Sequence, residues 1–340
     1  YDGVLEALKD NNCSICEKLR RDLAEEAFGH TAGYDTVISS YLALGQEARP
    51  LGGSTLGPDV FPKAGFIPMA LAQELRYGEN PHQKAAFYRD LYPGRDTLAK
   101  ARQLHGKELS FNNINDGAAA VEMAKMFKEP TVVAIKHANP CGWAVADTLV
   151  EAYEKAYTGD PVSIFGGIVA CNRVVDKATA TKMAEIFLEV IIAPGFAPDA
   201  LAVLQEKKNL RLLELPDLAS HQKERWWDYK RVKGGWLVQE ADVVGDDESA
   251  WRVVTKAAPS RQLMEDLKFG WQVVKFVKSN AIAVAKGGMS LGIGAGQMNR
   301  LESASIALRQ AGNKAQGAVM ASDAFFPFDD VVKLAAKQGI

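Results

Sequence analysis

Cysteine is scarce in this sequence, and long apolar runs are lacking. Four cysteines among 340 residues are too few for a disulfide framework and indicate a reducing, cytoplasmic location. The longest uncharged stretches, around residues 161–172 and 287–299, contain Gly, Asn, Gln or Ser and fall short of the ~18 apolar residues that a membrane helix needs. An excess of positive charge is lacking as well, because 40 Lys+Arg against 42 Asp+Glu leave a net charge of −2. No basic surface field is therefore expected, which argues against nucleic acid or a membrane as partner.

What is present is the composition of a folded globular protein, with 47% hydrophobic and 24% charged residues. At about 150 residues per domain, this length predicts two domains, or three if one is small. Both ends of the sequence look cut. The chain begins at Tyr1 with no signal-peptide pattern, and it stops at Ile340, where a strand would begin after a helix that starts at Asp329. We therefore expect a fragment truncated at both ends.

The first 73 residues differ from the rest. Apolar residues at helical spacing predict one helix over residues 18–28 and another over residues 31–44. Residues 46–68 then collect prolines and glycines with little periodicity, which is typical of a linker.

From about residue 74, short β-branched segments alternate with helical patterns, which favours α/β layers over a bundle or a sandwich. The expected strands cover residues 131–136, 168–171, 190–193 and 210–215. The expected helices cover residues 116–127, 149–157, 177–187 and 199–206.

A hairpin signal at Lys233-Gly234-Gly235 and a helix starting at Pro259-Ser260 separate this part from a second alternation. There we expect strands over residues 281–285 and 318–321, with a Gly-rich turn and a helix over residues 298–310 between them. Two tandem α/β units, divided near residues 240–260, account for this pattern best.

The most reactive constellation is Lys136-His137-Ala138-Asn139-Pro140, at the end of an apolar strand. Neighbouring strand residues face opposite ways, so Lys136 and His137 can serve one site only where the strand breaks. A nearby ammonium disfavours protonation of an imidazole, and a neutral His can act as a general base near pH 7. The alternative is a strand that simply ends in solvated polar residues.

Two further stretches suit ligand binding without requiring it. Arg76-Tyr-Gly-Glu-Asn-Pro-His-Gln83 is rich in side-chain donors that could hold a carboxamide or phosphate, with Arg76 as the anion clamp. Gly292-Ile-Gly-Ala-Gly-Gln297 could bring backbone N–H groups to an anion, although it matches neither the dinucleotide fingerprint nor a P-loop. A capped loop and a tight connection are the respective alternatives.

Three other features carry weaker signals. Asn280 precedes a strand, and Phe325, Phe326 and Phe328 surround Pro327, where they could clamp a flat ring or form a buried core corner. Cys13-x-x-Cys16 has no matching second pair for zinc. A deaminase-type zinc signature is also absent, because His137 is followed by Ala-Asn and Pro140-Cys141 by no second cysteine three residues on.

The order of these motifs and the residues in them resemble those of the AICAR formyltransferase/IMP cyclohydrolase family of purine biosynthesis. AICAR is 5-aminoimidazole-4-carboxamide ribonucleotide. The resemblance runs from about residue 15 to the end. It rests on Arg76–Gln83, Leu109-Ser-Phe-Asn-Asn113, Lys136-His-Ala-Asn-Pro-Cys-Gly142, Phe165-Gly-Gly167, Glu189-Val-Ile-Ile-Ala-Pro194, Lys278-Ser-Asn280, Gly292–Gln297 and Ala321-Ser-Asp-Ala-Phe-Phe-Pro-Phe328.

This resemblance implies a fold and its domains: two tandem, zinc-free α/β/α units of the cytidine-deaminase type. Residues 1–45 resemble the closing helices of the cyclohydrolase domain, residues 46–73 a linker, residues 74–250 the first formyltransferase subdomain and residues 251–340 an incomplete second one. Cyclohydrolase activity is not expected from this chain. A homodimer with active sites across the subunit interface is implied, and the binding of a monovalent cation is left open.

The implied reaction moves the formyl group of 10-formyltetrahydrofolate to the 5-amino group of AICAR. His137 would take the amine proton, Lys136 would keep His137 neutral and stabilise negative charge, and Asn280 would orient the formyl oxygen. The remaining implied contacts are, for the nucleotide, Arg76, Tyr77, Gly166, Glu189, Arg300 and Phe325, and, for the folate, Phe165, Leu301, Pro327 and Phe328.

Two other functions compete with this one. The chain could be a nonenzymatic remnant that keeps nucleotide binding or dimerisation without turnover. It could also be a hydrolytic deaminase on the same scaffold, in which case about one zinc ion per chain would be expected.

Overall fold

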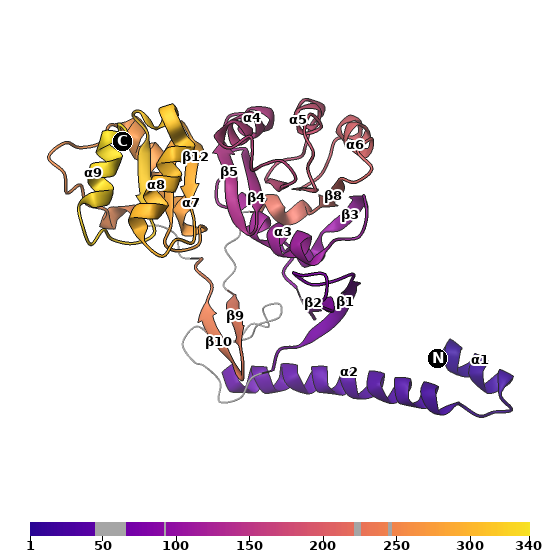
Figure 1. Ribbon diagram of the computed structural model, residues 1–340. Coiled ribbons are helices and arrows are strands. Elements are labelled where there is room, and N and C mark those ends of the chain that lie inside the picture. The colour runs from indigo at the N-terminus through magenta and orange to yellow at the C-terminus, as the bar shows by residue number, and fades with distance from the viewer. Residues whose placement is uncertain (45–65, 92, 221–225, 244–246) are drawn as a thin grey trace. The chain divides into compact units, whose positions relative to one another are not determined.

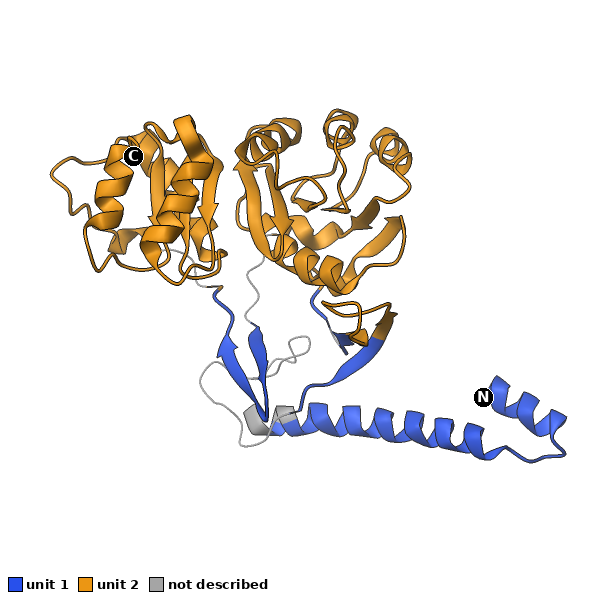
Figure 2. Cartoon of the chain, in the orientation of Figure 1, with its two compact units in different colours: residues 1–71, 88–94, 225–242 blue, residues 72–87, 95–224, 243–340 orange. Residues whose placement is uncertain are grey.

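The computed structural model describes residues 1–44, 66–91, 93–220, 226–243 and 247–340. The chain divides into two compact units, shown in Figure 2. Unit 1 holds residues 1–71, 88–94 and 225–242, and unit 2 holds residues 72–87, 95–224 and 243–340. Most of the predicted linker, residues 46–65, lies outside the described residues. The domain boundaries suggested by the sequence stay a prediction.

Unit 1 contains helices α1 (Asp2–Asp10) and α2 (Glu17–Leu44) and the antiparallel hairpin of β9 (Trp227–Val232) and β10 (Gly235–Glu240). The hairpin turns at Lys233-Gly234, as predicted. The two helices predicted over residues 18–44 are one continuous helix, so that prediction was wrong. A single interior glycine such as Gly29 costs a helix only about 1 kcal/mol relative to alanine, which the rest of a long helix can outweigh.

A two-stranded sheet is formed by β1 (Met69–Leu75) and β2 (Ala85–Asp90). Within the described residues, the main sheet of unit 2 has nine strands in the order β13-β11-β12-β5-β4-β6-β7-β8-β3. It is mixed, because β6, β7 and β8 run parallel and the remaining neighbours antiparallel. Its strands are β3 (Arg102–His105), β4 (Thr131–Lys136), β5 (Asn139–Val145), β6 (Ile168–Cys171), β7 (Val190–Ala193), β8 (Arg211–Glu214), β11 (Ile282–Lys286), β12 (Met289–Gly294) and β13 (Val319–Ser322).

Helices cover both faces of this sheet (Figure 1). The helices packed against the sheet are α3 (Phe111–Ala124), α4 (Leu149–Gly159), α5 (Lys177–Met183), α6 (Pro198–Gln205), α7 (Arg261–Lys275), α8 (Arg300–Ala311) and α9 (Asp330–Lys337). Alternate residues of β4 point to opposite layers, Val133 into the core under α3 and α7 and Val132 into the core under α4, α5 and α6. Unit 2 is therefore a mixed α/β structure with helices on both faces of its sheet, in agreement with the α/β layers that the alternation of elements predicted.

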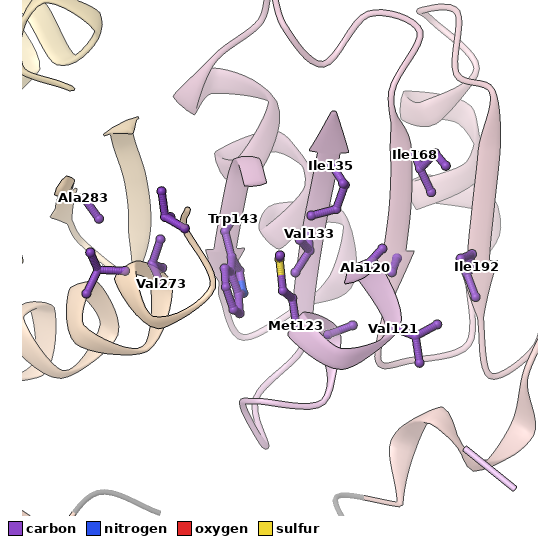
Figure 3. Packing of buried hydrophobic residues seen from close by; sticks show 14 of the residues in the cluster. Ala120, Val121, Met123, Val133, Ile135, Trp143, Ile168, Ile192, Val273 and Ala283 are labelled. Carbon is purple, nitrogen blue, oxygen red and sulfur yellow. The ribbon is translucent and has the colours of Figure 1, made fainter. Parts of the chain in front are cut away.

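One hydrophobic core runs beneath both α3 and α7. Figure 3 shows Met123 of α3, Trp143 of β5 and Val273 of α7 in this core, and all three are essentially inaccessible to solvent. Because this core spans strands from both halves of unit 2, the two predicted α/β units share a single sheet.

The two halves of the sheet repeat one arrangement. Strand β4 lies between β5 and β6, and β11 lies between β12 and β13, all antiparallel. Strands β5 and β12 meet at the centre through Ala144 and Met289. The order of elements from α3 to β6 is the same as the order from α7 to β13.

The sequence predicts a turn at the Gly-rich segment 292–297, either one that approaches a ligand or a tight connection, and that prediction is wrong for its first residues. Gly292 and Gly294 lie in β12. A Cβ on Gly292 would collide with the carbonyl oxygen of Ala307, and one on Gly294 with that of Ser303. These glycines therefore allow helix α8 to pack closely against the strand.

Candidate active site

A tight hairpin turn carries His137. Strands β4 and β5 pair up to Lys136 and Asn139, which leaves His137 and Ala138 as the two turn residues. Their φ angles are +53° and +57°. Such mirror-image turns match the twist of the strands they join, but non-glycine residues adopt this conformation at a cost of roughly 1–2 kcal/mol each. Something in the structure must therefore stabilise the turn.

The carboxylate of Asp116 on α3 holds this turn. The backbone N–H of His137 donates to Oδ2 of Asp116 at 3.0 Å, and that of Ala138 donates to Oδ1 at 2.8 Å. Helix α3 is itself fixed at its start by a reciprocal capping box between Ser110 and Asn113. The position of His137 is thus tied to the helix as well as to the strand.

Lys136, the last residue of β4, reaches the loop before β6. Its Nζ donates to the carbonyl oxygen of Phe165 at 2.7 Å. The next residue, Gly166, has a φ of +69°, and a Cβ there would lie 3.9 Å from Lys136 Nζ. A Cβ would therefore fit in the space, and glycine is favoured here by its backbone conformation.

Glu189 is held just before β7 by a buried amide. Nδ2 of Asn113 donates to Oε2 of Glu189 at 2.7 Å, and Asn113 is only 3% exposed. One carboxylate oxygen of Glu189 is thereby oriented by the protein, and its remaining lone pairs can accept hydrogen bonds from a ligand.

These residues surround a cavity of about 410 Å³, within the ~300–1,000 Å³ range of small-molecule sites. It contains cationic side chains, Lys107, Lys136 and Arg211, as well as the carboxylates of Asp116 and Glu189. Such a lining can bind an anionic, amide-bearing ligand beside an imidazole. The lining residues are Tyr77, Gly78, Lys107, Ser110, Asn112, Asn113, Asp116, Ile135, Lys136, His137, Gly166, Gly167, Ile168, Phe187, Glu189, Asn209 and Arg211.

Five residues that the sequence singled out share this cavity, namely Tyr77, Lys136, His137, Gly166 and Glu189. Two others lie beside it. The guanidinium carbon of Arg76 is 5.7 Å from the centre of the Tyr77 ring. Phe165, which is 58% exposed, places its ring 5.7 Å from that of Phe187.

Asn280 and Arg300 form a separate cluster and do not line the cavity. Arg300 Nη2 donates to Asn280 Oδ1 at 2.7 Å, and Nη1 contacts the Asp323 carboxylate. Burial disfavours ionisation of Asp323, but hydrogen bonds from Ser279 and Arg300 outweigh it and hold the pKa of this carboxyl below its usual range. The cluster is therefore an ordered ion pair with the Asn280 amide fixed beside it.

Phe325, predicted near the nucleotide base, lies at the protein surface, as do Leu301, Pro327 and Phe328, which were predicted to contact the folate. Phe325 is 82% and Phe328 72% exposed, Pro327 is exposed, and Leu301 is 38% exposed. The alternative of a buried aromatic corner was therefore wrong for Phe325 and Phe328. Only Phe326 packs against the core beneath α8.

Several lining residues were not singled out as site residues from the sequence. Asn113 belongs to the motif Leu109–Asn113, to which the sequence assigns no role, and Asp116 lies three residues beyond it. Lys107 is distant in sequence from Asn209 and Arg211, and the pairing of β3 with β8 brings them together. No local pattern marks these three residues.

The part of the chain that the structure describes has neither a cluster of metal ligands nor a helix that could span a membrane. That part contains no group of three or more His, Cys, Asp or Glu side chains placed to hold a metal ion. Cys13 and Cys16 are free and exposed. None of the described helices has the length and apolar character needed to cross a membrane.

Comparison with known proteins gives a consistent result. A family described as "AICARFT/IMPCHase bienzyme" matches residues 1–310. The chain is 52% identical over 340 residues to the bifunctional purine biosynthesis protein PurH of Thermoanaerobacter sp. (strain X514). It is 53% identical over 344 residues to the proteins of that name from Bacillus cereus (strain AH820) and Bacillus anthracis (strain CDC 684 / NRRL 3495). All of the chain is covered in each case, and it spans 64% of the length of these relatives.

Proposed function

Because the chain belongs to the AICARFT/IMPCHase bienzyme family, we propose that it transfers the formyl group of 10-formyltetrahydrofolate to the 5-amino group of AICAR. The observation that carries this proposal is the cavity in which Lys136 and His137 meet at a strained hairpin turn. The products would be formyl-AICAR and tetrahydrofolate, and the reaction would be a step of purine biosynthesis.

His137 acts as the general base in this proposal. The acceptor amine is weakly nucleophilic, because its lone pair is delocalised into a ring that bears a carboxamide. As the amine nitrogen bonds to the formyl carbon, His137 takes a proton from it, and the bond from that carbon to N10 of the folate then breaks as N10 is protonated. The Lys136 ammonium stabilises the negative charge that develops on the formyl oxygen.

The nucleotide would be held by groups around the same cavity. Tyr77 and Arg76 lie at one side of it, and Gly166 and Glu189 bind near the base in this proposal. Lys107 and Arg211 also line the cavity and offer positive charge to a phosphate.

Most of the folate side of the proposal comes from the second half of unit 2. Asn280, fixed by Arg300, would orient the formyl group, and Arg300 would act at the nucleotide phosphate or in a partner's site. Phe165 from the first half, together with Leu301, Pro327 and Phe328, would contact the folate, and Phe325 would lie near the base of the nucleotide. The exposure of Phe325 and Phe328 supports such a role and also supports a homodimer whose active sites lie across the subunit interface.

The domain assignment is part of the same proposal. The repeated order of strands around β4 and β11 supports two halves of the cytidine-deaminase type. Residues 1–45 would be the end of a cyclohydrolase domain, and no cyclohydrolase activity is proposed for this chain.

Single-turnover formyl transfer with excess protein, together with AICAR binding measured by calorimetry, tests the proposal. We expect both binding and transfer. Binding without transfer would instead favour a nucleotide-binding remnant. Release of ammonia from a nucleoside, with about one zinc ion per chain in metal analysis, would favour a deaminase.

A further inference from the structure

The contact between a helix aspartate and the backbone of a hairpin turn, which holds His137, occurs twice in unit 2. Asp116 is the sixth residue of α3, and Asp266 is the sixth residue of α7. Asp266 Oδ1 accepts a hydrogen bond at 3.1 Å from the backbone N–H of Gly288, in the turn between β11 and β12. Ala138 donates to Asp116 in the same way at the corresponding turn position. One carboxylate thus holds one hairpin turn in each half.

The two turns differ in sequence although their backbones agree. Gly287 and Gly288 have φ angles of +60° and +70°, close to those of His137 and Ala138. Glycine adopts this conformation without steric cost, whereas a residue with a Cβ does not. The turn at Gly287 and Gly288 therefore has the residue type that its backbone conformation favours. The turn at His137 and Ala138 has residues that the same conformation disfavours.

We propose that Asp116 is a positioning residue that holds His137 in its reactive place, an inference that rests on the proposed formyl transfer. Both of its carboxylate oxygens accept from the turn, one from each residue of the strained pair. Asp116 thereby stabilises the backbone conformation in which His137 lines the cavity together with Lys136 and Gly166. It acts on the reaction through His137.

Loss of this carboxylate has a specific consequence. The turn relaxes toward negative φ, and the imidazole leaves the position from which it reaches the acceptor amine. A misplaced base reduces stabilisation of the transition state much more than it reduces binding of the substrate. The expected signature is a lower kcat with little change in the KM for AICAR.

Three variants separate positioning from general stability. Asp116→Ala is expected to lower kcat at least tenfold and to leave the KM for AICAR within threefold. Adding Ala138→Gly to Asp116→Ala is expected to recover at least a third of the wild-type kcat, because glycine favours the turn without the carboxylate. Asp266→Ala removes the matched carboxylate from the other half and is expected to lower the melting temperature while kcat stays within twofold of the wild type.

Hydrogen–deuterium exchange at the amides of His137 and Ala138 gives a readout that does not depend on activity. These amides are expected to exchange slowly in the wild type and in Asp266→Ala, and at least tenfold faster in Asp116→Ala. A wild type without transfer would refute the proposed function, and the exchange rates would still decide whether Asp116 holds the turn.

Three results would overturn the positioning role. The first is an unchanged exchange rate in Asp116→Ala. The second is a normal kcat in that variant. The third is a double variant with no recovery of kcat, which would mean that the carboxylate itself takes part in the chemistry.

Discussion

Lys136 and Lys286 occupy equivalent places in the two halves of the sheet. Each ends a strand just before a two-residue turn, and each donates its Nζ at 2.7 Å to a backbone carbonyl, of Phe165 and of Gln316 respectively. In both cases the residue that follows the accepting carbonyl is a glycine with a positive φ, +69° at Gly166 and +66° at Gly317. The lysine therefore has a structural role that both halves share, and only the first half adds a histidine beside it.

Variants of Lys136 and Lys286 can be compared to separate the structural role of Lys136 from its proposed catalytic role. Lys136→Met and Lys286→Met each remove one charged donor to a carbonyl, so we expect similar losses of thermal stability. Lys136→Met should also lower kcat about 100-fold, the size expected when a group that stabilises developing negative charge is lost. Lys286→Met should keep kcat within about twofold. Steady-state kinetics and thermal unfolding of both variants check this, and equal effects on kcat would contradict it.

Glu189 is expected to contribute to binding of the nucleotide. Asn113 orients its carboxylate toward the cavity, and a hydrogen bond to a charged group contributes about 1.5–3 kcal/mol. Glu189→Gln should therefore weaken AICAR binding by roughly tenfold or more. Glu185→Gln, at an exposed position nearby, is the control. Titration calorimetry measures both, and an affinity of Glu189→Gln within twofold of the wild type would refute the role.

Gly292 is expected to be intolerant of any side chain. A Cβ there collides with the carbonyl oxygen of Ala307 on α8, so the helix would have to move. We expect Gly292→Ala to lower the free energy of unfolding by roughly 2–3 kcal/mol. In Gly195→Ala the new Cβ would make only an ordinary contact of 3.7 Å with Val174. Urea unfolding of the two variants should differ clearly, and equal stabilities would show that α8 is not packed as described.

The raised pKa of the Cys141 thiol predicts that the protein loses stability at alkaline pH. Burial raises the pKa of its thiol to about 12, whereas an exposed cysteine has a pKa of about 8.5. Between these values the unfolded chain releases this proton and the native protein keeps it, so the free energy of unfolding falls as pH rises, by up to about 1.4 kcal/mol per pH unit. Burial also raises the pKa of Cys171 and Tyr153, which adds to the effect.

Cys141→Ala isolates this contribution. Its free energy of unfolding should fall less between pH 8 and pH 10.5 than that of the wild type, in urea titrations at the two pH values. A fall as large as in the wild type would show that Cys141 does not carry a raised pKa.

The strands buried on both faces were the most predictable part of the fold. Residues 132–135, 168–171 and 190–193 are continuous apolar runs because helices cover both sides of them. The predicted bounds 131–136, 168–171 and 190–193 agree with β4, β6 and β7. Strands β5 and β12 were missed. Pro140, Gly142, Gly292 and Gly294 disfavour strands locally, but at Gly142, Gly292 and Gly294 a packed helix leaves no room for a Cβ.

The candidate site could be predicted only where its residues are neighbours in one sequence motif. Lys136 and His137 are adjacent, so the end of their strand could be recognised as a reactive place. Asp116 could not be chosen in the same way, because its role depends on how α3 packs against the β4–β5 turn, 21 residues further along. The contact of Asn113 with Glu189 spans 76 residues and depends on the order of strands in the sheet.

The most direct test is single-turnover formyl transfer by the wild type and by His137→Ala, with AICAR affinity measured on the same samples. We expect transfer by the wild type. For His137→Ala we expect transfer reduced at least 1,000-fold and affinity within about tenfold, because a general base acts mainly in the transition state. Transfer by His137→Ala at a rate close to that of the wild type would contradict the account.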